Sequence, residues 1–299
     1  MSTTANIKFD EADISGEDNL ELFKALRTNP QYAWPTIAMF VLSVAALISS
    51  TIAATIGAIP MSVGVAINSL CAYAQFSVFH DASHRAVSRN ITLNDFLGYV
   101  SLEYLSPFMP FSVLKFVHMI HHRDANGDID VGDTYVKSGP IWQLPFRWLT
   151  LDLSYMRVYA SYWQRRPRSE KTVMFLFIAT TMSLLIALAT QGYAWELFWL
   201  WFVPTRIAVV LISVVFVYLP HYPHTVTHRQ DPYKASNNRI GLEWLYNPLF
   251  MYQNYHLVHH LYPQAPFYRM QKLWDARKKF HMSHDPALVS PLGRRPNNM

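Results

Sequence analysis

Residues 36–59 read TIAMFVLSVAALISSTIAATIGAI and contain no charged side chain. After Pro60, a second uncharged run, MSVGVAINSLCAYAQFSVF, occupies residues 61–79. A hydrocarbon layer of about 30 Å requires about 20 apolar residues in helical conformation. Each run is long enough to cross a bilayer, so the pair predicts a helical hairpin whose two outer ends lie on one side of a membrane.

Two further uncharged runs occupy residues 172–191 and 207–220. The second of these reaches the required length only by extending back through Pro204 to Leu197, which places Arg206 inside it. Because charge within a membrane is rare and usually has a partner, we expect Arg206 to pair with an acid on a neighbouring helix. Snorkelling to the interface and lining a substrate route are the alternatives. Charged residues make up only 15% of the 299 residues, as expected for four membrane spans.

The basic residues indicate which side of the membrane the loops occupy. The turns at Pro60 and at residues 191–196 have no Lys or Arg, whereas residues 80–171 carry eleven and the stretch after Pro220 carries ten. Basic loops stay in the cytoplasm. We therefore expect an integral protein of the bacterial inner membrane, with both termini and the large middle segment cytoplasmic.

The chain divides into three regions. Residues 1–35 form an acidic N-terminal segment, residues 36–282 an integral membrane domain, and residues 283–299 a polar C-terminal tail. The apolar stretch from Leu97 to Phe116 is interrupted by prolines and charges, so we expect an interfacial or re-entrant segment there. Residues 123–171 begin with a polar Asp/Gly loop and continue as amphipathic sequence, which predicts a cap on the cytoplasmic surface.

Two compositional features exclude other kinds of protein. The net charge of +5 comes mostly from residues that flank the spans, which favours contact with anionic membrane lipids over nucleic acid. The single cysteine, Cys71, lies within the second span and is expected to be a small core residue. No disulfide and no cysteine-ligated iron–sulfur cluster can form within the chain.

The thirteen histidines are distributed unevenly. Three short clusters, HDASH at 80–84, HMIHH at 118–122 and HLVHH at 256–260, contain His80, His84, His118, His121, His122, His256, His259 and His260. Helix positions i, i+3 and i+4 share a face, so we expect each cluster to present its imidazoles toward a common point. Eight neutral imidazoles gathered without a metal would repel each other once protonated, whereas bound metal removes that cost.

Ligand type indicates the metal. Zinc catalysis usually uses three protein ligands, so eight or nine nitrogens imply two ions. Calcium and magnesium prefer oxygen ligands, and copper electron-transfer sites need a thiolate. Imidazole suits iron, which carries out O2 chemistry. We therefore expect an all-α membrane protein with four spans in two hairpins, whose cytoplasmic helical cap carries a di-iron site.

A ninth ligand is expected from the sequence HYPHTVTH at residues 221–228. His221 directly follows the fourth span and is our choice, while His224 and His228 are the alternatives. Acids should orient the imidazole N–H groups, and Asp81, Asp128, Asp130 and Asp133 are candidates, with a solvated loop as the alternative for the last three. His281 and His284 lie in polar sequence and are expected at the surface.

These residues resemble the membrane fatty acid desaturase and hydroxylase superfamily, which is built around three histidine boxes. Within it, the chain is most similar to the β-carotene ring hydroxylases of the cyanobacterial type. The resemblance covers residues 79–270 and rests on HDASH and on the motifs SGPIW at 138–142, WFVP at 201–204, YLPH at 218–221 and QNYHLVHHLYP at 253–263. It favours His221 as the ninth ligand and suggests Asn254 and Tyr255 as groups that support the ligands.

The resemblance implies two non-haem iron ions, O2 as co-substrate and an external, ferredoxin-like electron donor, with no catalytic residue beyond the metal ligands. The expected reaction is hydroxylation of a carotenoid ring. Desaturation of a fatty-acyl group, as acyl-lipid or acyl-CoA, is the alternative on the same scaffold. A metal-handling transporter is a third, remote reading, because transport sites usually lie near the bilayer midplane and these clusters lie outside the spans.

Overall fold

The computed structural model describes residues 18–106 and 108–298, and most of them are helical. The first eight helices are α1 (Leu20–Arg27), α2 (Trp34–Thr55), α3 (Met61–Ser83), α4 (Ile91–Leu105), α5 (Phe111–Asp124), α6 (Val131–Lys137), α7 (Leu144–Leu149) and α8 (Leu151–Ser161). They are followed by α9 (Arg168–Leu188), α10 (Ala194–Leu197), α11 (Val203–Ile212), α12 (Leu219–His221), α13 (Glu243–Leu249), α14 (His256–Leu261), α15 (Met270–Ala276) and α16 (Lys278–Met282).

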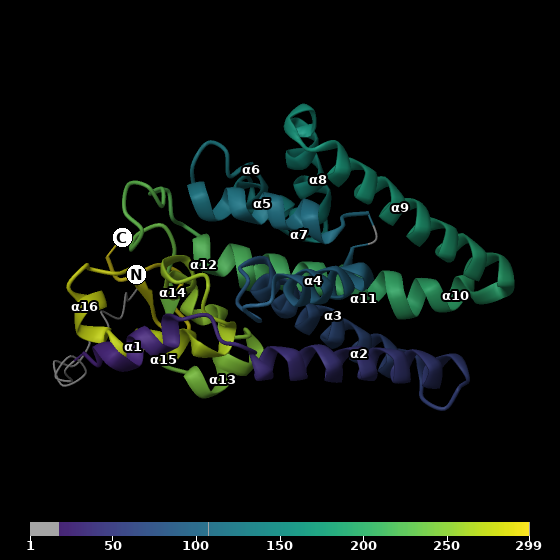
Figure 1. The fold of residues 1–299 in the computed structure, drawn as a ribbon, viewed down its shortest axis with the longest axis horizontal. Helices are drawn as coiled ribbons and strands as arrows, with labels where there is room; N and C mark the ends of the chain where they lie inside the picture. Colours follow the sequence, from purple (N-terminus) through teal and green to yellow (C-terminus); the bar gives the residue numbers. More distant parts are fainter. Residues whose placement is uncertain (1–17, 107, 299) are drawn as a thin grey trace.

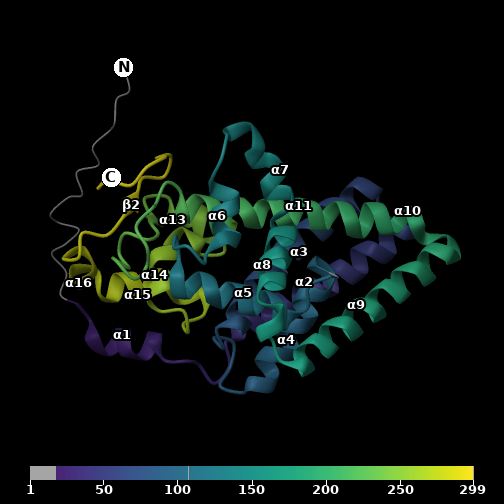
Figure 2. The ribbon, with the colours of Figure 1, turned by 90° about the horizontal axis from the view of Figure 1, so that it is seen from above.

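Three helical stretches are long and apolar enough to cross a membrane: residues 34–55, residues 61–83 and the 54 residues from Arg168 to His221. The third stretch is not one straight helix, because Gly192 has φ of 98°, a conformation that ends a right-handed helix. The chain reverses there, so that α9 and the α10–α11 segment diverge from a shared corner (Figure 2). Thus the two apolar runs predicted in this region belong to two separate helical arms.

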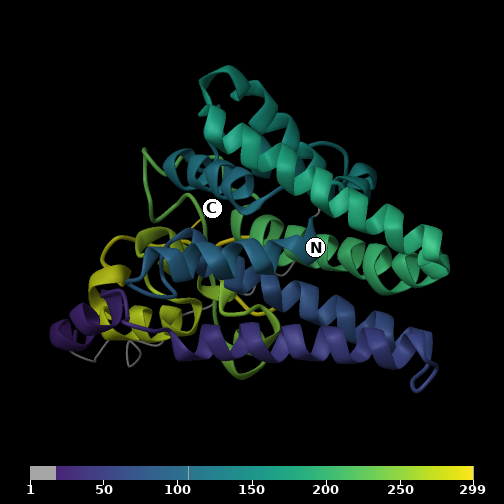
Figure 3. The same ribbon diagram turned by 45° about the vertical axis from the view of Figure 1, so that its right-hand side comes forward.

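The bundle has two distinct ends. The turn between α2 and α3 and the turn between α9 and α10 lie at one end, while α12, α14, α15 and α16 gather at the other (Figure 1). Seen from a second direction, α2 and α9 run along opposite sides of the bundle, with α3, α4 and α11 between them (Figure 3). Leu42 is 69% exposed on α2 and Leu176 is 63% exposed on α9, which suits an apolar solvent better than water.

A buried amide joins three helical segments inside the bundle. Asn68 on α3 accepts a hydrogen bond from Ser50 and donates to Thr51 on α2 and, at 2.8 Å, to the carbonyl of Leu200. Leu200 lies in the π-helical turn Phe198–Phe202, whose i→i+5 bonding widens the helix. Its carbonyl also accepts the hydroxyl of Tyr104.

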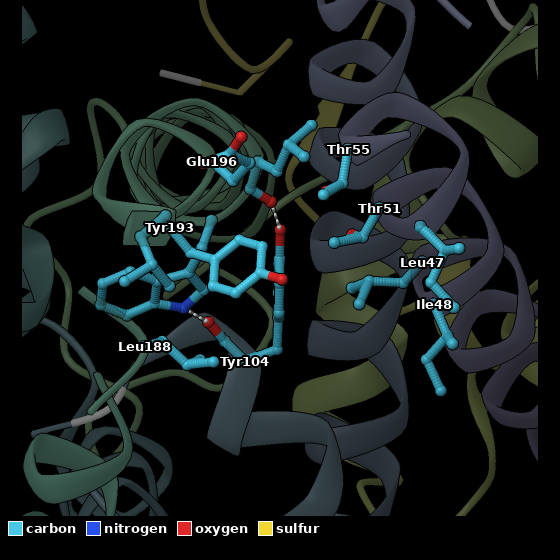
Figure 4. A pocket seen from close by; sticks show the side chains of 12 residues that line it. Leu47, Ile48, Thr51, Thr55, Tyr104, Leu188, Tyr193 and Glu196 are labelled. Carbon is cyan, nitrogen blue, oxygen red and sulfur yellow. Dashed lines mark hydrogen bonds between the residues drawn. The ribbon is translucent and has the colours of Figure 1, made fainter. Parts of the chain in front are cut away.

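Beside this junction is a mostly apolar cavity of about 330 Å³, lined by α2, α4, α9 and α10. Figure 4 shows Thr51 and Thr55 on one wall and Tyr193 on the other, with Tyr104 between them. The cavity lies at the end of the bundle that holds the two interhelical turns.

The segment between the second and third predicted spans folds into short helices. The apolar stretch Leu97–Phe116 is divided between α4 and α5, and α4, with 15 residues, is too short to cross a bilayer of ordinary thickness. Leu102 and Phe111 are buried in the main core. Helices α6 to α8 lie within residues 123–171, where a cap is predicted, and α7 packs against α11.

Arg206 pairs with an acid, as predicted. Its guanidinium donates to both carboxylate oxygens of Asp152 on α8, at 2.6 and 3.1 Å, and to the carbonyl of Leu149 at 3.2 Å. Cys71 is buried within α3, also as predicted.

The C-terminal residues differ from expectation. Within the predicted polar tail, β2 (Leu288–Val289) pairs in parallel with β1 (Asn238–Arg239), and both residues of β2 are buried. The prediction of a surface position for His281 was wrong, because its ring is fully buried and stacks on Trp274 with centroids 5.1 Å apart. The imidazole of His281 therefore serves as an aromatic packing group beside Trp274. His284 is exposed, as expected. The acidic residues 1–17 lie outside the described part of the chain.

Asn68→Leu removes three interhelical hydrogen bonds. Such bonds contribute about 0.6 kcal/mol each in membranes, so we expect the free energy of unfolding to fall by about 2 kcal/mol. The matched control is Ser69→Ala, which removes only the bond within α3 from the Ser69 hydroxyl to Val65. Denaturant titration in detergent micelles measures both. Equal stability of the two variants would contradict the role of Asn68 as a junction.

Candidate metal centre

Four elements bring the predicted histidines together. His80 lies in the last turn of α3 and His84 is the residue that caps it. The second cluster lies at the end of α5, and the third occupies α14. His221 closes α12, at the end of the helical arm that begins at α10. These elements meet at the end of the bundle opposite the two interhelical turns (Figure 1).

The structure sorts all nine of these histidines into two groups, in each of which the ligand atoms lie within 4.8 Å of one another. The first group contains His80, His84, His118, His122 and His259, and the second contains His121, His221, His256 and His260. His221 therefore joins the boxes. By contrast, His224 and His228 lie outside both groups, and His224 instead contacts the Asn237 amide at 3.3 Å.

This sorting corrects the expectation that each cluster faces one point. Residues at i and i+4 stay together, as His118 and His122 do, whereas the residue at i+3, His121, joins the other group. In the third cluster, His259 separates from His256 and His260 in the same way. Successive helix residues point about 100° apart, so a His-His pair naturally serves two neighbouring sites.

The distances between ring nitrogens fit shared metal ions. In the first group, His84 Nε2 lies 2.8 Å from His118 Nε2, and His259 Nε2 lies 2.9 Å from His122 Nε2. In the second group, the nitrogens of His121, His260, His256 and His221 follow one another at 3.1, 3.1 and 2.9 Å. Two nitrogens bound at about 2.1 Å and about 90° to one ion would be about 3.0 Å apart.

Burial supports the same interpretation. His80 Nε2 is buried and has no hydrogen-bond partner among the described residues, although it points into the first group. Burial, together with the neighbouring imidazoles, holds the pKa of His118, His122, His256, His259 and His260 well below its usual value. These rings are therefore neutral and present lone pairs, which is the form that binds metal.

His121 has a different environment from the other ligands. Its Nδ1 lies 2.8 Å from Asp133 and 3.2 Å from Asp130, both of them buried. Burial alone would lower the pKa of His121, but the two carboxylates outweigh it and raise the pKa to about 10. The carboxylates thus hold the proton on Nδ1, and Nε2, which faces the second group, must release its own proton before it can bind a metal.

The two carboxylates are themselves held in place. Asp133 accepts the hydroxyl of Tyr155 on α8, and Asp130 accepts the backbone N–H of Asn126 at 2.9 Å. These contacts decide between the two interpretations of this loop, since Asp130 and Asp133 are buried acids beside a histidine while Asp128 is exposed.

Sequence reasoning missed one supporting residue. The side-chain oxygen of Gln253 lies 2.6 Å from His256 Nδ1, which fixes that ring as Asp133 fixes His121. Gln253 precedes His256 by three residues, so helical spacing was the available signal. The carbonyl of Ala235 lies 3.4 Å from His221 Nδ1. Because it is a backbone group, no pattern of side chains in the sequence could predict this contact.

Three predicted supporting residues bond elsewhere in the structure. Asp81 accepts from the Thr36 hydroxyl at 2.8 Å and from the backbone N–H of Phe267 at 3.1 Å. Asn254 donates to Asn247, and the hydroxyl of Tyr255 donates to Glu243. They hold the elements that carry the histidines, because Asp81 ties α3 to α2 and to the segment before α15.

Comparison with known proteins gives consistent matches. A β-carotene ketolase from Paracoccus sp. is 28% identical over 199 residues, which cover 66% of this chain and 72% of the ketolase. An sn-1 acyl-lipid omega-3 desaturase (ferredoxin) from Synechocystis sp. is 22% identical over 229 residues, covering 68% of this chain and 63% of the desaturase. A desaturase of the same description from Nostoc sp. is 26% identical over 249 residues, covering 72% of this chain and 67% of the desaturase.

The family model for fatty acid desaturases matches residues 53–289, which include every histidine of both groups. This match covers far more than half of the chain, and the apolar helices agree with a membrane-associated protein. The chain therefore belongs to the fatty acid desaturase family and is an oxidoreductase.

Proposed function

We propose that the nine histidines hold two non-haem iron ions and that the protein uses O2 to oxidise a lipid. His80, His84, His118, His122 and His259 would hold one ion, and His121, His221, His256 and His260 the other. When bound, iron supplies the O2 chemistry that attacks an unactivated C–H bond. The observation that carries this proposal is the chain of ring nitrogens about 3 Å apart in two adjacent groups.

The residues of the chain prepare this site. Asp133 and Gln253 orient His121 and His256, so that two nitrogens of the second group face inward before metal binds. Phe76 and Phe216 pack below His80, with ring centroids 6.3 and 5.8 Å away, and exclude water from the membrane side. An apolar floor under the histidines suits a lipid substrate.

The arrangement in the membrane follows from the helical arms. We propose four crossings in two hairpins, formed by α2, α3, α9 and the α10–α12 arm, within an integral domain of residues 36–282. The reversal at Gly192 supports two crossings in the longest apolar stretch, because 54 residues would extend about 81 Å as one helix. The excess of basic residues supports a position of the histidines and both termini on the cytoplasmic side of the bacterial inner membrane.

The first candidate substrate is a carotenoid ring, which would be hydroxylated. The similarity to β-carotene ketolases supports oxidation of a carotenoid ring but does not separate formation of a hydroxyl group from formation of a ketone. Desaturation of an acyl lipid is the second candidate, supported by the two acyl-lipid desaturases. The names of both desaturases include ferredoxin, so a ferredoxin-like protein is the proposed electron donor.

We expect His260→Ala to lower the iron content of the purified protein and to abolish turnover without preventing membrane insertion. His260 Nε2 faces the second group, whereas His284 is exposed, so His284→Ala is the matched control and should keep both iron and activity. Metal analysis of both detergent-purified variants measures the effect. Full iron occupancy in His260→Ala would refute the ligand assignment.

We expect Asp133→Asn to weaken iron binding by about 10- to 100-fold, because loss of the carboxylate frees the ring of His121. The control is Asp128→Asn, which changes an exposed acid of the same loop. Competition with a chelator of known affinity gives both constants. If the two variants lost iron equally, the orienting role of Asp133 would be wrong.

Expression in a bacterial host that accumulates β-carotene, followed by joint analysis of pigments and fatty acids, decides between the substrates. A carotenoid with a new hydroxyl or keto group would support the first candidate, and a new acyl double bond the second. If His260→Ala gave the same products as the unaltered chain, the products could not be assigned to this site.

A further inference from the structure

A small interior cavity lies next to the first histidine group. Phe76 and Leu114 line it, and each precedes a histidine, His80 or His118, by four residues, so that each lies one helical turn below that ring. The cavity continues down between α4, α8 and α11, past Ser106. Its volume of about 20 Å³ holds about one water molecule.

The walls of this cavity contact the first histidine group directly and the second group only through an acid. The Phe76 ring packs against His80 of the first group, with centroids 6.3 Å apart. On the other side, the hydroxyl of Tyr155 donates to Asp133, which holds His121 of the second group. The cavity therefore lies beside the first group and is linked to the second through Asp133.

A second hollow lies on the outer side of α11. It has a volume of about 460 Å³ and is lined by Leu149 of α7 and by Phe202, Arg206, Ile207 and Val210. Phe202 is 45% exposed and Ile207 is 40% exposed. In the proposed topology α11 crosses the membrane, so this outer groove faces the bilayer.

One ion pair separates the outer groove from the interior cavity. Arg206 lines the groove and Asp152 lines the cavity, and two hydrogen bonds of 2.6 and 3.1 Å join them. Two other hydrogen bonds join α7 to the helical arm that contains α11. Arg206 donates to the Leu149 carbonyl at 3.2 Å, and the Ser213 hydroxyl donates to the Trp148 carbonyl at 2.8 Å. The wall between lipid and cavity is therefore a polar contact between α7–α8 and α11.

We propose that the lipid substrate enters the interior cavity sideways from the bilayer, between α7–α8 and α11, and that the Arg206–Asp152 pair holds this entrance closed. The proposal rests on the proposed function, because it needs a substrate dissolved in the membrane. The cavity is too small for a carotenoid ring or an acyl chain, so α7–α8 must move before either can enter.

Other features of the bundle fit this route better than a route from the far end. The cavity of about 330 Å³ in Figure 4 is also apolar, but it is lined by Thr51, which follows Thr36 by 15 residues on α2. Thr36 bonds to Asp81 beside His80, so that cavity lies about 22 Å away from the histidines along α2. A ring bound there could not reach them.

Cysteine labelling tests the entrance without requiring turnover. In a Cys71→Ala background, Ser106→Cys places one thiol in the interior cavity, and the full chain in liposomes is exposed to a lipid-soluble maleimide. Asp152→Asn and, separately, Arg206→Met should raise the labelling rate by about tenfold, because loss of the pair shifts the population toward the open state. Val210→Trp, which fills the outer groove, should lower it by about tenfold.

The matched control is Leu184→Trp on α9, which adds the same side chain at a site that is 57% exposed and away from the groove, and should leave labelling unchanged. Iron content, measured for every variant, identifies any that has lost its fold. Unchanged labelling in both Asp152→Asn and Val210→Trp would overturn the entrance, as would faster labelling by a water-soluble maleimide than by the lipid-soluble one.

Turnover of the same variants separates the two proposals. With active protein, Val210→Trp should lower kcat/KM for the lipid while Leu184→Trp does not. If the unaltered chain oxidises neither carotenoid nor acyl lipid, the proposed function fails, whereas the labelling rates still report whether the entrance exists.

Discussion

The site depends on the angle of about 100° between successive residues of an α-helix. His121 and His122 are adjacent in sequence, as are His259 and His260, and in both pairs one ring joins each group. Two short helices, α5 and α14, therefore supply ligands to both proposed ions, and neither ion is held by one helix alone. This explains why α5 and α14 must dock against each other and against the end of α3.

The surrounding fold holds these helices in register. Asp81 links α3 to α2 and to the backbone of Phe267, which follows α14, while Asn68 links α2, α3 and the arm that carries His221. Polar bonds of this kind are favoured inside an apolar bundle, because the alternative is an unsatisfied group in hydrocarbon. Asp133, oriented by Tyr155, then completes the link between helix α8 and His121.

Much of this arrangement could be predicted from spacing alone. The uncharged runs predicted the apolar helices. The positions of the histidines predicted the nine residues that the structure brings together, including His221. The sorting into two groups was not foreseen, because shared helix faces suggested one target for each cluster. Asp130 and Asp133 could not be distinguished from Asp128 in sequence, since burial depends on how α6 packs. The burial of His281 likewise depends on Trp274 and Tyr233, which only the tertiary fold brings beside it.

The central claim is that two iron ions occupy two separate, adjacent groups of histidines. Diffraction from crystals of the iron-loaded protein, recorded on both sides of the iron absorption edge, tests it most directly because anomalous differences locate iron independently of the protein density. We predict two peaks, one among His80, His84, His118, His122 and His259 and one among His121, His221, His256 and His260. A single peak, or a peak bound by histidines drawn from both groups, would contradict the account.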